Sequence, residues 1–270
     1  MSTKGRCAIC GEVGKLTDDH VPPRSVVPES AIIVRRLADA LDQHAEKREP
    51  QPGRIAKVFR TLCKRCNNDL LGSRYDPALA RFANDLSVWV RSGFQLFLSL
   101  PSVAIIELQP ALVARAVIGH LLASEPERSA RHEELEGTLP TSMRAYFLSD
   151  ELAFPPDFQL FVWPYPSTQT VIGRGIGHLD LRGGEPIVAD TLKFFPLAFA
   201  VVSVEAKMPL IPATRIRPEQ AAGMDDTVSL EIPLRGGPGL TWPERPQASS
   251  LVLLNRDRVL TIVRPSDRAF

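Results

Sequence analysis

Hydrophobic residues recur at helical spacing in the middle of the chain. Between residues 77 and 98 they lie three or four positions apart, which is the period of an amphipathic helix. These positions are Leu79, Phe82, Ala83, Leu86, Trp89, Val90, Phe94, Phe97 and Leu98. A second helix is predicted from Pro110 to Ala123, since proline is favoured at the first position of a helix. We expect both helices to pack in the core, and neither His120 nor His132 has accompanying ligand residues.

Beyond residue 150 the pattern changes to short runs rich in β-branched and aromatic residues, with Pro and Gly between them. Such runs are typical of strands. They cover residues 159–163, 168–173, 198–204, 227–232 and 250–254. The glycine-containing segment 173–178 does not have the spacing of a dinucleotide-binding loop, and we interpret it as a β-turn. The sequence therefore predicts a β-rich region at this end of the chain.

A strand is also predicted near the start of the chain, over residues 16–24. It should end at the prolines at positions 22 and 23, because proline cannot continue a strand ladder. His20 would then lie at the end of this strand. Because side chains alternate along a strand, the adjacent Asp19 and His20 face opposite sides unless the proline bend or a bulge changes their direction.

The segment between this strand and residue 66 predicts a helix and then a second strand. Ser30 can cap a helix that continues to Leu41 and is stopped by the proline- and glycine-containing segment 49–53. The second strand is expected over residues 55–63, and a further helix should begin after Cys66. The first of these helices would be an insertion between the two strands.

Composition is ordinary for a globular protein of one or two domains. The 270 residues are 44% hydrophobic and 23% charged, and the net charge of +1 gives no overall field that would attract nucleic acid or an anionic membrane. The longest hydrophobic stretch, 194–204, is interrupted by Pro196 and is shorter than the roughly 20 residues of a membrane-spanning helix. The first residues do not resemble a secretory signal, so we expect a cytoplasmic protein without a membrane partner and without disulfides.

The four cysteines form two identical C-x-x-C pairs, and no cysteine is left over. They are Cys7, Cys10, Cys63 and Cys66. Two such pairs can supply four thiolates to one tetrahedral zinc ion, with Zn–S bonds of about 2.3 Å. A thiol redox pair is the alternative, but it does not require two identical spacings. The 52 residues between the pairs exceed the roughly 15–20 of a simple zinc ribbon, which indicates an insertion.

The order of these motifs resembles that of the HNH, or ββα-metal, endonucleases that carry a treble-clef zinc site. The resemblance covers residues 5 to about 76: a C-x-x-C pair, then Asp19-His20-Val21-Pro22-Pro23, then Leu62-Cys63-x-x-Cys66-Asn67. It implies that His20 is the general base and that Asp19 and Asn67 bind the catalytic cation. The family often has an asparagine five residues before the third cysteine, where this chain has Val58.

The residue types also suit phosphodiester hydrolysis on chemical grounds. Histidine has an unperturbed pKa of about 6.5 and can deprotonate water near neutral pH. A carboxylate and an amide oxygen are the hard ligands that Mg²⁺ or Mn²⁺ prefers. The alternative for His20 is a non-catalytic role, either as a surface histidine or as a residue that orients a zinc thiolate. Asn68, Asp69 and Asp76 are weaker alternatives as ligands, and Asp76 could equally be a helix cap.

Local charge favours a nucleic-acid partner. Residues 1–76 contain 14 basic and 10 acidic residues, whereas residues 77–270 contain 18 basic and 21 acidic residues. The segment 53–66 has five basic residues and no acidic one, which is typical of a phosphate-binding surface or of a solvated strand face. The candidate phosphate-binding residues are Arg54, Lys57, Arg60, Lys64 and Arg65, with Arg24 as a weaker one.

The expected fold class is α+β. We expect a zinc-stabilised HNH nuclease module at 1–76, a helical segment at 77–150 and a β-rich domain of unknown role at 151–270. The expected function is a metal-dependent endonuclease acting on DNA, with structural Zn²⁺ and catalytic Mg²⁺ or Mn²⁺, under the control of a partner or a small-molecule activator. Stand-alone proteins of this family and size resemble restriction or phage-defence effectors. The alternative is a non-catalytic zinc-dependent nucleic-acid-binding protein with a degenerate HNH site.

Overall fold

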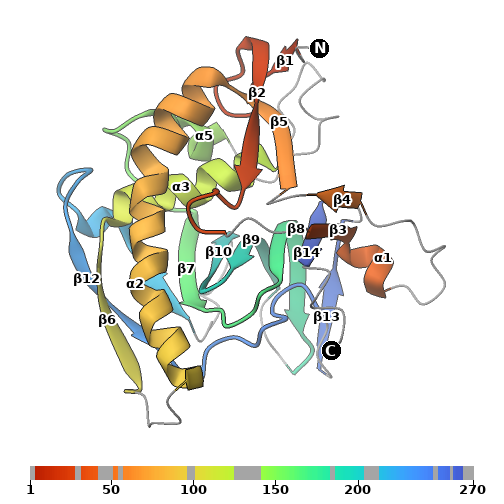
Figure 1. Cartoon of the computed structure of the whole chain (residues 1–270), viewed down its shortest axis with the longest axis vertical. Helices are drawn as coiled ribbons and strands as arrows, with labels where there is room; N and C mark the ends of the chain where they lie inside the picture. The colour runs from red at the N-terminus through yellow and green to blue at the C-terminus, as the bar shows by residue number, and fades with distance from the viewer. Residues whose placement is uncertain are drawn as a thin grey trace.

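The computed structural model describes residues 4–27, 32–41, 51–53, 57–95, 101–124, 141–182, 186–203, 213–245, 249–255 and 258–263. Its architecture is a mixture of helices and antiparallel sheets, with helices in the middle of the chain, so the expected α+β class is confirmed. Figure 1 shows a small hairpin at one end of the molecule, a large sheet at the other, and helices beside and between them.

The small hairpin carries the cysteines. Strands β1 (Lys4–Arg6), β2 (Val13–Val21) and β5 (Lys57–Cys63) form one antiparallel sheet in the order β1-β2-β5. A wide π-type helix, η1 (Arg65–Tyr75), follows β5 directly and continues into α2 (Asp76–Gln95). The predicted strand before the two prolines, the strand before Cys63 and the helix after Cys66 are therefore all present.

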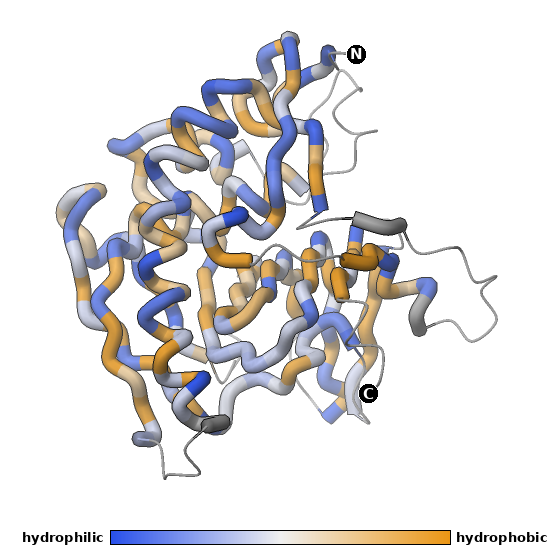
Figure 2. Tube along the Cα trace, in the orientation of Figure 1, coloured by the Kyte–Doolittle hydropathy of each residue, from blue (hydrophilic) through white to orange (hydrophobic). Residues whose placement is uncertain are grey.

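Helix α3 (Pro110–Ala123) joins the hairpin to the large sheet. All of its residues are buried, and it packs against β5 and η1 on the hairpin side and against β9 (Ile187–Phe194) on the sheet side. Its last carbonyls accept hydrogen bonds from both sides: Thr61 donates to Ala123 at 2.6 Å, and Arg174 donates to Leu121. A cation at a helix C-terminus also complements the helix dipole. Figure 2 shows hydrophobic and hydrophilic residues alternating along α2, as the sequence period predicts.

The large sheet is antiparallel and has nine strands within the described chain. Its order is β11 (Thr214–Ile216), β7 (Phe158–Pro164), β10 (Leu197–Ser203), β9, β8 (Thr170–Asp180), β14 (Val259–Val263), β3 (Ile32–Arg36) and β4 (Gln51–Gly53), with β13 (Ser250–Leu253) also paired to β8. The remaining elements are the pair β6 (Val103–Leu108) and β12 (Val228–Pro233), the short helices α1 (Leu37–Leu41) and η2 (Pro218–Gln220), and α5 (Thr141–Leu148). The five strands predicted beyond residue 150 correspond to β7, β8, β10, β12 and β13, but β8 continues seven residues beyond its predicted end, and β9, β11 and β14 were not predicted.

The helix predicted from Ser30 is wrong in its first half. Residues 32–36 form strand β3, which pairs with β14 and with β4, and only Leu37–Leu41 is helical. Ile32, Ile33 and Val34 are consecutive β-branched residues that are all buried. A continuous β-branched run fits a strand covered on both faces, and this tertiary pairing overrides the helical spacing of the hydrophobic positions.

The β-turn predicted over residues 173–178 is also wrong. This segment lies inside β8, whose register against β9 shifts between Gly173 and Ile176. Gly175 has a φ of 62°, a left-handed conformation that favours glycine, and its N–H donates to Asp190. The glycines therefore form a bulge within a long strand rather than a turn between two strands.

The three-part division of the chain stays a prediction, but its parts are interleaved. Strand β3, from the first segment, completes the sheet that the last segment builds. One continuous hydrophobic core extends from Cys7 in the hairpin to Ile262 in β14. The hairpin is thus anchored to the rest of the molecule through shared packing as well as through α3.

Candidate metal centre and catalytic site

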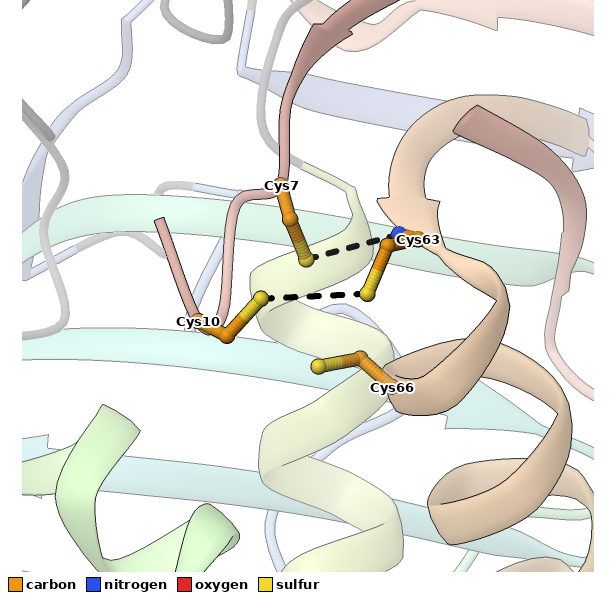
Figure 3. A group of neighbouring side chains, drawn as sticks. All are labelled: Cys7, Cys10, Cys63 and Cys66. Carbon is orange, nitrogen blue, oxygen red and sulfur yellow. Dashed lines mark hydrogen bonds between the residues drawn. The ribbon is translucent and has the colours of Figure 1, made fainter. Parts of the chain in front are cut away.

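The four cysteines converge on one point. Their sulfur atoms all lie within 4.8 Å of one another, and Figure 3 shows the side chains pointing inward from the turn before β2 and from the end of β5 and the start of η1. The Sγ atoms of Cys10 and Cys63 are 3.7 Å apart, close to the roughly 3.8 Å that tetrahedral coordination with 2.3 Å bonds requires. The cluster could hold a structural metal ion such as zinc, and the predicted convergence of the four cysteines is confirmed.

The electrostatics of the cysteine cluster explain why a cation suits it. A hydrogen bond from Cys66 lowers the pKa of Cys7 to about 5, whereas burial raises the pKa of Cys10 to about 12. The pKa of Cys66 is also raised, first because its thiol is the donor to Cys7 and then because it is buried. Without a metal, Cys7 is therefore the thiol of these three that ionises most readily. A divalent cation would allow the other thiols to ionise.

Strand β2 turns its acidic residues in different directions. Two residues of β5 oppose Asp18 of β2, because the register shifts between Thr17 and Asp19. Asp18 is exposed and accepts a hydrogen bond from Arg60 at 2.5 Å, which holds the pKa of Asp18 below its usual value. Asp19 is only 5% exposed and points into the protein. The register shift is a bulge in β5 opposite Asp18, so it does not change the direction of Asp19 relative to His20, which follow each other in the regular ladder.

His20 lies at the end of the hairpin, where the resemblance requires it. Its ring is half-buried, and the Arg24 guanidinium donates a hydrogen bond to Nε2 at 2.8 Å. Burial, and then the charge of Arg24, lower the pKa of His20, so the imidazole is neutral near pH 7 and Nε2 is its basic atom. Val58 pairs directly with His20 across the β2–β5 ladder. The family often has an asparagine at this position. An asparagine here would therefore lie opposite His20, the residue that it would hold in place.

Asn67 ties the helix after the second cysteine pair to the same strand. Its side chain is buried, and its Nδ2 donates to Thr17 Oγ1 at 2.9 Å and to the Asp18 carbonyl at 3.0 Å. The amide oxygen is left as the remaining acceptor of this side chain. The structure thus connects Asn67 to the strand that carries Asp19. Neither the second cysteine motif nor the Asp-His motif indicates this contact by itself.

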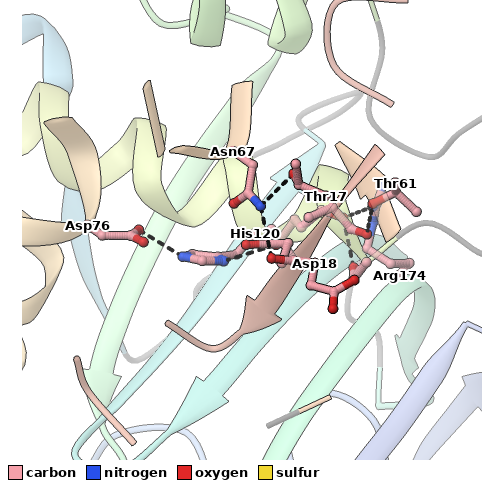
Figure 4. Close-up of polar contacts among 11 residues, drawn as sticks. Thr17, Asp18, Thr61, Asn67, Asp76, His120 and Arg174 are labelled. Atoms are coloured by element: carbon pink, nitrogen blue, oxygen red, sulfur yellow. Dashed lines mark hydrogen bonds and ion pairs between the residues drawn. The ribbon is translucent and has the colours of Figure 1, made fainter. Parts of the chain in front are cut away.

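His120 was not among the candidate residues, and the observation that it has no accompanying ligands is wrong. The structure places it between Asp76 and Asp19: Nε2 is 2.9 Å from Asp76 Oδ1 (Figure 4), and Nδ1 is 3.8 Å from Asp19 Oδ2. Burial alone would lower the pKa of His120, but the two carboxylates outweigh it and raise the pKa to about 10. The only signal in the sequence is a histidine within an almost wholly hydrophobic helix.

Four of the predicted phosphate-binding residues lie in β5 or at the start of η1, and Arg24 follows β2. Arg24, Arg60, Lys64 and Arg65 are exposed, Lys57 is half-buried over the Phe59 ring, and Arg54 lies outside the described residues. Arg60 already pairs with Asp18. An interface with nucleic acid stays a prediction for all six residues.

Comparisons of the chain with protein-family models, with curated proteins and with solved structures find no match. The likeness to HNH endonucleases therefore depends on the motif residues alone. Within the described part of the chain, no helix is both long and apolar enough to cross a membrane.

Proposed function

We propose that the protein is a metal-dependent HNH endonuclease that hydrolyses phosphodiester bonds in DNA. The observation that carries the proposal is the contact of Asn67 with Thr17 and Asp18. This contact brings the residue after the second cysteine pair to the strand that carries Asp19 and His20. The motif residues that the family places at its active site therefore come from two segments that touch.

His20 would act as the general base. Its neutral ring presents Nε2, which can take a proton from the attacking water. Arg24 occupies Nε2 in the structure, so it must release this atom before the reaction. A substrate phosphate offers the guanidinium a charged, bidentate partner in place of a neutral nitrogen, which supports Arg24 as a phosphate contact.

Asp19 and Asn67 would hold the catalytic cation. Asp19 Oδ2 is buried and has no hydrogen-bond partner within the described structure, and such an oxygen is a strong candidate ligand. When bound there, Mg²⁺ or Mn²⁺ would neutralise charge on the phosphate and on the departing 3′ oxygen. The β-rich part of the chain would determine which nucleic acid is cut or when, as in a restriction or phage-defence effector controlled by a partner or a small activator.

A second function class is favoured by two specific observations. Val58 replaces the usual asparagine opposite His20, and Asp19 is almost completely buried. A non-catalytic zinc-dependent nucleic-acid-binding protein with a degenerate site would tolerate both features. The basic residues Lys64 and Arg65 would serve either function.

The deciding experiment is cleavage of supercoiled plasmid with Mg²⁺ or Mn²⁺, after metal analysis has found about one zinc per chain. Wild type should nick or linearise the plasmid, and His20→Ala should not. His178→Ala is the matched control, because His178 is a half-buried histidine of β8 whose ring contacts the Pro243 carbonyl in the large sheet. Equal cleavage by wild type and His20→Ala would refute the role of His20, and zinc-loaded protein that binds DNA without cutting it would favour the binding function.

A further inference from the structure

His120 and Asp19 face each other near the candidate site with two polar atoms that make no hydrogen bond within the part of the chain that the structure describes. The imidazole is fully buried and the Asp19 side chain is only 6% exposed, yet Nδ1 and Oδ2 face each other at 3.8 Å. This separation is too long for a hydrogen bond, which needs about 2.7–3.2 Å. Neither atom has any other hydrogen-bond partner among the described residues. Two buried polar atoms left unsatisfied are costly, so an additional group between them is expected.

The separation of the two atoms fits a shared metal ion. Ligand atoms bound to one cation through bonds of about 2.0–2.2 Å lie roughly 3–3.5 Å apart at octahedral or tetrahedral angles. The two side chains would have to approach by only a few tenths of an ångström. They also differ usefully in type, because a carboxylate oxygen and an imidazole nitrogen together suit Mn²⁺ and related divalent ions.

Asp76 completes the arrangement on the other side of the ring. Its Oδ1 lies 2.9 Å from His120 Nε2. Histidines that bind metals commonly donate their second ring N–H to a carboxylate, which fixes the tautomer and directs the other nitrogen at the metal. With Nε2–H directed at Asp76, the lone pair of His120 would lie on Nδ1, the atom that faces Asp19.

We propose that His120 and Asp19 are ligands of one divalent cation and that Asp76 orients His120 for this role. The proposal rests on the proposed function, because this cation is the one that His20 would need beside it. Binding releases the Nδ1 proton to solvent, and the cation then balances the charges of Asp19 and Asp76 beside a neutral ring. A helix outside the predicted nuclease module would thus supply a ligand, which makes the catalytic site depend on the docking of α3.

The direct test needs no substitution of the buried site. Zinc-loaded wild-type protein is titrated with Mn²⁺, and the bound ion is examined by pulsed electron paramagnetic resonance for coupling to an imidazole nitrogen. We expect one Mn²⁺ per chain with such a coupling. The coupling should persist in His20→Ala, because His20 is proposed as the general base and not as a ligand of the cation. Binding without nitrogen coupling, coupling that disappears in His20→Ala, or no Mn²⁺ binding would each overturn the proposal; the last result would favour a bridging water.

Two conservative substitutions of His120 test whether this residue is a metal ligand or only a packing residue. In His120→Gln the amide can reach the position of Nε2 and keep Asp76, whereas in His120→Asn it can reach the position of Nδ1 and keep the cation. We expect His120→Gln to weaken Mn²⁺ binding by at least about 10-fold and His120→Asn to weaken it less, with Asp76→Asn in between. Equal loss in both variants, or greater loss in His120→Asn, would indicate a structural role.

These measurements distinguish this proposal from the proposed function. If Mn²⁺ binds with nitrogen coupling but wild type cuts no nucleic acid, the site stands and the endonuclease function fails. If wild type cuts plasmid through His20 while Mn²⁺ shows no nitrogen coupling, the function stands and the assignment of His120 fails. Zinc content, measured in every sample, shows that the cysteine cluster is intact.

Discussion

Two buried polar clusters support the ends of the β2–β5 hairpin, and they are built in different ways. The cysteine cluster takes its ligands from the hairpin and the helix turn that follows it, whereas the Asp19–His120–Asp76 cluster takes one residue each from β2, α3 and α2. The first cluster holds the hairpin to itself. The second also ties the hairpin to α3, a helix from outside the predicted nuclease module.

Removing zinc should have the largest effect. Structural zinc sites contribute apparent binding free energies of about 10–16 kcal/mol, comparable to the whole stability of a domain. We expect Cys66→Ser, or treatment with a chelator, to abolish hydrogen-exchange protection in β2 and β5, because Cys66 is fully buried in the shared core. Protection in β7, β9 and β10 should survive longer. If the hairpin stayed protected without zinc, the cysteines would be only packing residues.

Breaking the second cluster should have a smaller but clear effect. His120→Leu leaves two carboxylates without their cation, and loss of one partner from a buried ion pair typically costs about 3–5 kcal/mol. The matched control is Arg74→Ala, which removes an exposed ion pair with Asp150 and should cost at most about 1 kcal/mol. Denaturant unfolding without added divalent cations measures both. Equal costs would show that His120 contributes no more than a surface contact.

The difference between the clusters also explains how far the sequence could be read. Cys7, Cys10, Cys63 and Cys66 have a spacing that specifies tetrahedral geometry, and His20 follows from its motif, so their proximity was predictable. His120 has no local pattern, because its partners lie 101 and 44 positions earlier in the chain. The helix prediction over residues 32–36 was wrong for the same reason. These residues pair with β14, far along the chain, and the helical spacing of their hydrophobic residues does not indicate that pairing. Sites made by residues of a local motif could be predicted from the sequence, whereas contacts between distant segments could not.

The two clusters should respond to pH in opposite directions. Acidification protonates thiolates and releases zinc, so the cysteine cluster loses its contribution to stability as the pH falls. The pKa of His120 in the folded protein is about 10, above the unfolded value of 6.5. Its contribution is therefore fully present below pH 6.5 and is lost as the pH rises through about 10. Thermal unfolding between pH 7 and 10.5, without added divalent cations, should show this alkaline loss in wild type and not in His120→Gln. An unchanged loss in the variant would assign it to other groups.

The smallest expected effect is at position 58, and it bears on function rather than stability. Val58 is 38% exposed and pairs with His20, so Val58→Asn should change the free energy of unfolding by less than about 1 kcal/mol; the loss of β propensity is offset by solvent access. If the nuclease proposal is right, an amide opposite His20 should steady the strand end and raise plasmid cleavage several-fold. Val88→Asn, at an exposed position of α2, is the control and should leave cleavage unchanged. A gain at position 58 alone would indicate that Val58 weakens an otherwise competent site. The absence of any gain, in protein that cuts through His20, would mean that the ladder already holds His20 well enough without the amide.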